Sequence, residues 1–264
     1  MSGPTALIIG TSSGIGKGLL KLLSRSHYTI GSSHTKSGSN IISLDLCKKN
    51  TISTFINKLK KKLLSRKIDV LILNSGVSYP TSILHAKDEE IEMSFSLNTT
   101  NQIILVRELI PYLNDGSKII YINSKSSIIT LPFLGIYAAS KSANLSIAEA
   151  LRIELSPFKI SVSSICLGNT KTAMWINNFK KSASIIHQNS SYKPQITKAI
   201  NMGMNKYENA MELDFASRKI LSIINLKHLK SIYHIGTDTK IFLIMRRLLP
   251  NWLLNKIIIK QYGF

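Results

Sequence analysis

Tyr137 and Lys141 lie four residues apart in the stretch GIYAASK, at the start of a segment rich in helix-forming residues. Residues with this spacing share one face of a helix, with Cβ atoms ~5–6 Å apart. An ammonium beside a phenol favours the phenolate and lowers a pKa that is ordinarily about 10. The pair could therefore exchange protons with a ligand. It could equally be a surface pair without function, so the rest of the chain must decide.

A glycine cluster, Gly10, Gly14 and Gly16, follows the apolar run LIIG and opens a helical pattern. A dinucleotide site needs a sharp turn there, a backbone that can approach a pyrophosphate, and helix N–H groups facing the anion. The spacing is G-x3-G-x-G instead of G-x-G-x-x-G, and glycines alone could form an ordinary tight turn. Their place between a strand and a helix favours a nucleotide site.

Apolar runs of strand length alternate with helical patterns along the chain. Runs such as VLIL and KIIYI are continuously apolar, which is typical of parallel strands covered on both faces. The strands are predicted at 6–9, 28–31, 41–43, 70–73, 118–122, 160–165 and 232–234, and the helices at 16–26, 51–65, 89–113 and 137–156. This alternation predicts an α/β fold, a Rossmann-type doubly wound parallel sheet of about seven strands with helices on both faces, formed by residues 1–264 as a single domain.

Three segments do not fit the alternation. The connection SHTKSGSN between the second and third strands is too short for a crossover helix, so a loop or a single turn is expected. Residues 173–210 are expected to form an excursion beside the substrate cleft. The basic, apolar segment 240–264 is divided by Pro250 into two short helical pieces. It could lie on an anionic membrane surface, cover the cleft or pack in an oligomer interface.

The composition restricts the class of protein and its partners. Lys and Arg number 34 against 14 Asp and Glu, giving +20. Such a charge can attract nucleic acid, membranes or anionic ligands, but lysine also recurs in surface runs such as KLKKKLLSRK, and no nucleic-acid motif accompanies it. No nucleic-acid partner is expected. Cys47 and Cys166 are too far apart for a metal or disulfide framework and are expected to be buried thiols. Without a visible signal peptide or an apolar run of ~20 residues, a cytoplasmic protein is expected.

Polar residues also follow the third and fourth predicted strands. Asp45 could accept a hydrogen bond from an adenine amino group, or it could cap the following helix. Asn74 and Gly76 follow the fourth strand, at the edge of the sheet where α/β proteins bind ligands. An ordinary strand-to-loop turn would explain these two residues equally well.

These motifs, in this order, resemble the short-chain dehydrogenase/reductase family. The matching stretches are GTSSGIG from Gly10, Asp45, NSG from Asn74, SLNTTNQ with Asn98, YINSKSS with Ser124, then Tyr137 and Lys141, and finally CLGNTKT. Two departures stand out. Ser75 replaces an alanine, and Leu167-Gly168 replaces the family's Pro-Gly. Loss of that proline is expected to leave the loop less restrained.

The resemblance implies a catalytic tetrad of Asn98, Ser124, Tyr137 and Lys141 that interconverts a carbonyl and an alcohol by hydride transfer. Tyr137 would be the general acid/base, Lys141 would lower its pKa and bind the nicotinamide ribose, and Ser124 would bind the substrate oxygen. Ser124 lies 13 residues before Tyr137, as in the family, with Ser126 and Ser127 as fallbacks. Asn98 would hold a water molecule; otherwise it would cap or kink its helix.

The end of the second strand indicates which cofactor is bound. A carboxylate there would bind the ribose hydroxyls of NAD and repel a 2′-phosphate. The segment TIGSSHTKSG has no acid, and its Ser32, Ser33, His34 and Lys36 could accommodate a phosphate, so NADP(H) is favoured over NAD(H). The expected cofactor-binding residues are Gly10, Ser12, Ser13, Gly14, Ile15, Gly16, Ser32, Asp45, Leu46, Asn74, Ser75, Gly76, Tyr137, Lys141, Thr170 and Thr172.

The expected activity is thus that of an NADP(H)-preferring reductase acting on a small-molecule carbonyl or alcohol. The family resemblance also implies a homodimer or homotetramer. Three alternatives remain open at this point. The chain could be a cofactor-binding regulatory protein without turnover, a membrane-surface reductase of a lipid-like substrate, or a nucleic-acid binder that relies on its charge alone.

Overall fold

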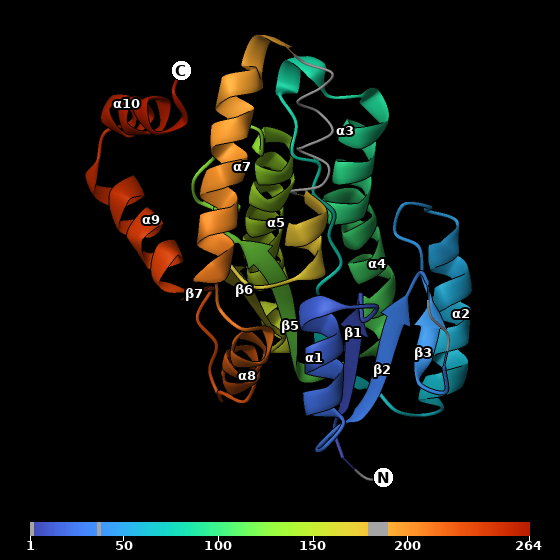
Figure 1. Cartoon of the computed structure of the whole chain (residues 1–264). Coiled ribbons are helices and arrows are strands. Elements are labelled where there is room, and N and C mark those ends of the chain that lie inside the picture. The colour runs from blue at the N-terminus through green and yellow to red at the C-terminus, as the bar shows by residue number, and fades with distance from the viewer. Residues whose placement is uncertain (1–2, 36–37, 179–189) are drawn as a thin grey trace.

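One parallel sheet organises the described part of the chain. The computed structural model describes residues 3–35, 38–178 and 190–264. Within these residues seven strands form a sheet in the order β3-β2-β1-β4-β5-β6-β7, with helices around it (Figure 1). The strands are β1 (Thr5–Ile9), β2 (Tyr28–Ser33), β3 (Ile41–Ser43), β4 (Ile68–Leu73), β5 (Leu113–Ser124), β6 (Ser161–Leu167) and β7 (Ile232–Ile235). The predicted α/β fold and its parallel sheet are confirmed.

Helices cover both faces of the sheet. The alternation of side chains along β1 shows how they are held: Leu7 and Ile9 pack into the core beneath α2, α4 and α5, whereas Ala6 and Ile8 pack beneath α1 and α8. All four residues are fully buried. The helices are α1 (Gly14–Leu23), α2 (Thr51–Leu63), α3 (Asp88–Phe95), α4 (Asn101–Leu109), α5 (Gly135–Glu154), α7 (Lys193–Glu208), α8 (Leu213–Ile224), α9 (Thr237–Leu248) and α10 (Asn251–Tyr262).

The strand order reverses at β1, whose neighbours are β2 on one side and β4 on the other. The chain moves outward from β1 to β3 and then crosses back to continue from β4 to β7. Open α/β sheets bind ligands at such a reversal, outside the carboxyl ends of the strands. The glycine turn after β1 and the Asn74 turn after β4 therefore lie at the same crevice.

The helix predicted at 89–113 is wrong as a single element. The chain forms α3, a π-helical turn (Ser96–Thr100), α4 and a final 3₁₀ turn (Ile110–Tyr112), and Leu113 already belongs to β5. The π-helical turn contains Asn98, which is fully buried. The Asn144 side chain donates to the Asn98 carbonyl oxygen at 2.6 Å, so a tertiary contact takes up a backbone acceptor inside this turn. Propensity alone cannot reveal such a contact.

The segments outside the alternation mostly follow expectation. The described residues between β2 and β3 form bends and a turn, and Lys36 lies outside the described residues. Residues 173–210 contain α7, and segment 240–264 forms most of α9 and all of α10, which Pro250 separates. Cys166 is buried, but Cys47 is only half-buried, which corrects the expectation for that thiol.

Candidate active site

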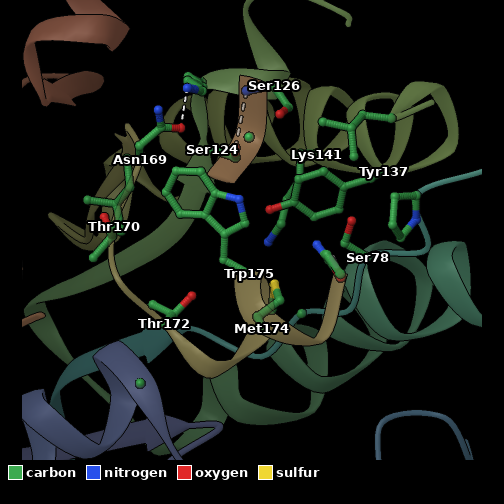
Figure 2. Close-up of a pocket in the computed structure, with 18 of the residues that line it drawn as sticks. Ser78, Ser124, Ser126, Tyr137, Lys141, Asn169, Thr170, Thr172, Met174 and Trp175 are labelled. Atoms are coloured by element: carbon green, nitrogen blue, oxygen red, sulfur yellow. Dashed lines mark hydrogen bonds between the residues drawn. The ribbon is translucent and has the colours of Figure 1, made fainter. Parts of the chain in front are cut away.

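Ser124, Tyr137 and Lys141 meet at the carboxyl end of β5. Ser124 is the last residue of that strand, whereas Tyr137 and Lys141 lie one turn apart near the start of α5. The Ser124 hydroxyl group lies close enough to that of Tyr137 to act on the pKa of the phenol. Ser124 Oγ also accepts from the backbone N–H of Ser126 at 3.1 Å, which orients it. Figure 2 shows Tyr137 and Lys141 projecting into the same part of a cavity.

Burial sets the electrostatics of this group. It raises the pKa of Tyr137, while the nearby Ser124 hydroxyl group works in the opposite direction. The lowered phenol pKa that we expected from Lys141 is thus not seen in this structure, because the cost of burying a phenolate dominates. Burial also lowers the pKa of Lys141, from 10.5 to about 8. The Lys141 ammonium donates to the carbonyl oxygen of Ile122 at 3.2 Å.

The Asn98 side chain connects the loop after β4 to α5 by hydrogen bonds. Its side chain accepts from Val77 N at 2.8 Å and donates to Val77 O at 2.8 Å and to Ser140 Oγ at 2.9 Å. Ser140 in turn donates to the backbone oxygen of Tyr137 at 2.8 Å. A β-carbon added at Gly76 would lie 3.3 Å from Lys141 Nζ and 3.4 Å from Asn98 Oδ1, so a larger residue there would press closely on both side chains. The side chain of Asn98 therefore ties the Gly76 loop to α5.

The glycine turn has the shape that a dinucleotide requires. Gly10 and Gly14 adopt positive φ angles of 90° and 57°. A β-carbon at Gly16 would lie 2.0 Å from Gly10 O and 2.6 Å from Asn74 Nδ2. The N-cap residue of α1, Ser13, makes no side-chain capping hydrogen bond, so the first N–H groups of the helix are left for an anion. The residues present therefore fit a bound nicotinamide dinucleotide.

One serine after β1 and two at the end of β2 hold the turn together. Gly10 N donates to Ser32 Oγ at 3.0 Å, and the hydroxyls of Ser12 and Ser33 are 2.8 Å apart. Ser32 and Ser33 are each only 2% exposed. In this structure Ser32 therefore shapes the turn from inside, and His34 is the residue after β2 that lines the cavity.

Asp45 and Leu46 also serve the fold in this structure. Asp45 Oδ1 accepts from Cys47 N at 2.9 Å, and its carbonyl oxygen accepts from Thr51 Oγ1 at 2.7 Å, which builds the turn before α2. Leu46 is 4% exposed within the core, and its carbonyl oxygen accepts from Asn101 Nδ2 at 2.8 Å. Asp45 thus shapes this turn but does not cap α2, whose N-cap residue is Asn50, and its contact with adenine stays a prediction.

The loop after β6 is held by the C-terminal part of the chain. Asn169 N donates to Asp238 Oδ2 at 2.9 Å, and Gly168 N donates to Ile235 O at 2.8 Å. Lys171 N donates to Met211 O at 2.9 Å, and Met211 N returns a bond to the oxygen of Asn169 at 3.0 Å. Tertiary hydrogen bonds thus restrain this loop where the family's proline is missing, and a looser loop stays a prediction.

Asp238 also pairs with Lys125, which follows Ser124 directly. Their charged groups are 2.6 Å apart, and Lys125 Nζ donates to the side-chain oxygen of Asn169 as well. Burial lowers the pKa of Lys125, with Asp238 acting against it. Burial by itself would raise the pKa of Asp238, yet Lys125 and the surrounding hydrogen bonds hold it below its ordinary value. Sequence reasoning missed this pair. The available signal was an acid two residues after Gly236, at the start of a helix, in a chain with few acids.

A cavity of about 450 Å³ joins these parts. Of the predicted site residues, the structure places Asn98, Gly16, Ser32, Asp45 and Leu46 outside its lining. Lysines 125 and 206, with apolar side chains from α7 and α10, line it as well. The predicted residues that do line it are Gly10, Ser12, Ser13, Gly14, Ile15, Asn74, Ser75, Gly76, Ser124, Tyr137, Lys141, Thr170 and Thr172.

Two relatives named as NADPH-dependent reductases are similar over nearly the whole chain. The NADPH-dependent 1-acyldihydroxyacetone phosphate reductase of Saccharomyces cerevisiae is 28% identical, over 97% of this chain and 90% of its own. The NADPH-dependent 3-dehydrocapnine reductase of Ornithobacterium rhinotracheale is 25% identical, over 97% of this chain and 96% of its own.

The fold is shared with solved structures at lower identity. The crystal structure of a short-chain dehydrogenase from Burkholderia cenocepacia in complex with NADP superposes with a TM-score of 0.75, at 21% identity, and covers 96% of this chain and 97% of that one. The family model for short chain dehydrogenases matches residues 4–183, more than half of the chain. The match includes the glycine turn, Ser124, Tyr137 and Lys141. The chain therefore belongs to the short-chain dehydrogenase/reductase family.

Proposed function

We propose that the protein is an NADP(H)-dependent reductase that converts a ketone on an apolar chain to the alcohol, and the reverse. The observation that carries the proposal is that Tyr137, Ser124 and Lys141 line one cavity, which continues to the glycine turn, with the Tyr137 and Ser124 hydroxyl groups close together. Hydride transfer to a carbonyl builds negative charge on its oxygen, and this charge must be stabilised and protonated. Two hydroxyl groups and one cation at the same point meet that need.

Each polar side chain has a distinct task in this proposal. When bound, NADPH would supply the hydride. Ser124 would donate a hydrogen bond to the substrate oxygen, and Tyr137 would transfer the proton to it. Lys141, still mostly protonated at neutral pH with a pKa of about 8, would stabilise the phenolate that remains. Asn98 would keep α5 and the Gly76 loop in register through its bonds to Val77 and Ser140.

The preference for NADPH rests on the end of β2. No carboxylate occurs among Ser32, Ser33 and His34, and His34 lines the cavity. An uncharged or basic residue at this point accepts a 2′-phosphate, whereas an acid repels it. The two NADPH-dependent relatives named above support the same choice. Comparison of kcat/KM for NADPH and NADH tests it, and a strong NADH preference would contradict it.

The cavity indicates the class of substrate. Beyond Tyr137 its walls are mainly apolar, and the charged group among the described residues of α7 that line it is Lys206. A cavity of this kind suits a ketone attached to an acyl or alkyl chain. The yeast relative is named as a reductase of 1-acyldihydroxyacetone phosphate, a ketone that carries an acyl chain, which supports this class. The apolar wall is formed by Leu131, Phe133, Met174, Trp175, Ile196, Ile200 and Tyr262.

The decisive experiment follows NADPH oxidation by the purified protein with a series of keto compounds of increasing chain length, with identification of the product. We expect kcat/KM to rise with chain length, because each buried CH₂ contributes about 0.8 kcal/mol. NADPH binding without oxidation of any compound would favour a regulatory protein instead. A preference for short polar ketones would overturn the substrate class.

Tyr137→Phe tests the catalytic assignment. We expect it to lower kcat on the order of 10²–10⁴-fold while folding and NADPH binding persist. Tyr121→Phe is the matched control, because Tyr121 is also buried, lies outside the cavity lining, and has no hydrogen-bond partner for its hydroxyl among the described residues. Near-normal turnover in Tyr137→Phe would remove this residue from the mechanism.

A further inference from the structure

The outer side of α9 carries an exposed apolar stripe. Ile241, Ile244 and Leu248 are 55%, 55% and 73% exposed. Their spacing of three and four residues places them on one face of the helix. Thr239, which is fully buried, lies on the opposite side and faces the body of the protein. The apolar stripe is therefore directed away from the core, where no described segment covers it.

The neighbouring helix α10 has the same division. Leu254 and Tyr262 are 2% and 7% exposed and fix its inner face. Trp252 and Ile259, which are 67% and 48% exposed, lie on the other side. Lys256 and Lys260 fall on this outer side too, at helical spacing from Trp252. Figure 1 shows α9 and α10 along the edge of the molecule beyond β7, far from α2.

The charge of this segment indicates its partner. Residues 239–264 contain no Asp or Glu, and their basic residues are Lys240, Arg246, Arg247, Lys256 and Lys260. A self-complementary contact between two copies would bring these like charges together. An anionic lipid surface instead attracts each of them, and it accepts apolar side chains and tryptophan at the depth of the headgroups.

We propose that the outer faces of α9 and α10 dock on the surface of an anionic bilayer. Among the described residues, no helix has both the length and the apolar character needed to cross a membrane. Docking would therefore be peripheral, with the apolar stripe in the headgroup region and the basic side chains at lipid phosphates. The occupant is the bilayer itself, and it needs no specific lipid beyond negative charge.

The same helix also reaches the cavity. Tyr262, on the inner face of α10, lines the cavity together with Ile196 and Ile200 of α7. A protein docked through α10 would hold the apolar wall of its cavity beside the lipid in which an acyl-chain ketone dissolves. This route for the substrate rests on the proposed reductase function, whereas docking itself does not.

The test is co-flotation of the full chain with vesicles of phosphatidylcholine and phosphatidylglycerol, compared with pure phosphatidylcholine. We expect binding to the anionic vesicles that weakens as salt rises above ~0.1 M. Lys256→Gln with Lys260→Gln should weaken binding about 30-fold, and Ile244→Ser with Leu248→Ser on the order of tenfold or more.

Matched control variants separate docking through α9 and α10 from a general effect of charge and from loss of catalysis. Lys60→Gln with Lys61→Gln removes the same charge from exposed positions on α2 and should leave binding within about twofold. Tyr137→Phe should bind vesicles as well as the wild type, so loss of turnover and loss of docking are distinguishable. Equal binding by all variants would overturn the proposal. The proposal would also be overturned if the wild type did not bind vesicles and sedimentation equilibrium showed a dimer that the α9 substitutions dissociate.

Discussion

We predict that the buried charge of Lys141, a proposed catalytic residue, lowers the unfolding free energy of the protein at neutral pH. Its side chain is nearly completely buried, and burial lowers its pKa from 10.5 to about 8. An ammonium that loses its proton more easily in the folded state costs stability at neutral pH, where it is charged in both states. We therefore expect Lys141→Met, which keeps the length and removes the charge, to abolish NADPH oxidation and yet to stabilise the fold.

The size of the effect follows from the pKa. A change from 10.5 to about 8 corresponds to about 3 kcal/mol of unfolding free energy. Methionine also loses the hydrogen bond to Ile122 O, which costs about 1 kcal/mol. The net gain at pH 7 is thus about 2 kcal/mol. Between pH 8 and 10.5 the unfolded chain still binds the proton that the folded chain has released, so wild-type stability rises and the advantage of Lys141→Met disappears.

The assay is urea denaturation of both proteins without cofactor, at several pH values from 7 to about 10.5. The difference between the two unfolding free energies cancels the titration of other groups, such as the buried tyrosines. Lys60→Met, an exposed change on α2, should show no such pH dependence. If Lys141→Met is less stable than the wild type at pH 7, or if the difference does not change with pH, the reasoning about this buried charge is refuted.

Three further changes test the surroundings of the site. Asp238→Asn should leave Lys125 without its charge partner, lower the unfolding free energy by about 2 kcal/mol and raise the KM for NADPH. The additional change Lys125→Met should restore much of the lost stability. An unchanged unfolding free energy in Asp238→Asn would show that the pair does not stabilise the fold. Gly16→Ala should weaken NADPH binding, measured by calorimetry, more than tenfold, because the new β-carbon would collide with Gly10 O; unchanged affinity would disprove the tight turn. His34→Asp should lower the ratio of kcat/KM for NADPH over NADH at least tenfold, and an unchanged ratio would place the 2′-phosphate elsewhere.

The local pattern of the sequence was sufficient for much of the architecture. Continuous apolar runs and short connections predicted the parallel sheet, since buried parallel strands need apolar side chains on both faces. The strand ends were less certain: β5 begins at Leu113, well before the predicted 118, because the pairing partner, β4, decides where a strand starts. The glycine turn and the Tyr137–Lys141 spacing were also readable, since both depend on residues close in the chain.

Contacts between distant residues decided the rest. Asp238 and Lys125 are 113 residues apart, and nothing local to either one indicates that the pair restrains the loop after β6. The π-helical turn at Asn98 depends on Asn144, and the half-buried state of Cys47 depends on how the turn before α2 folds. The sequence alone determined which groups are present and which share a strand or a helical turn. Only the tertiary structure decided how deeply Tyr137 and Lys141 are buried, and thus the direction of their pKa values, because desolvation depends on packing by the whole chain.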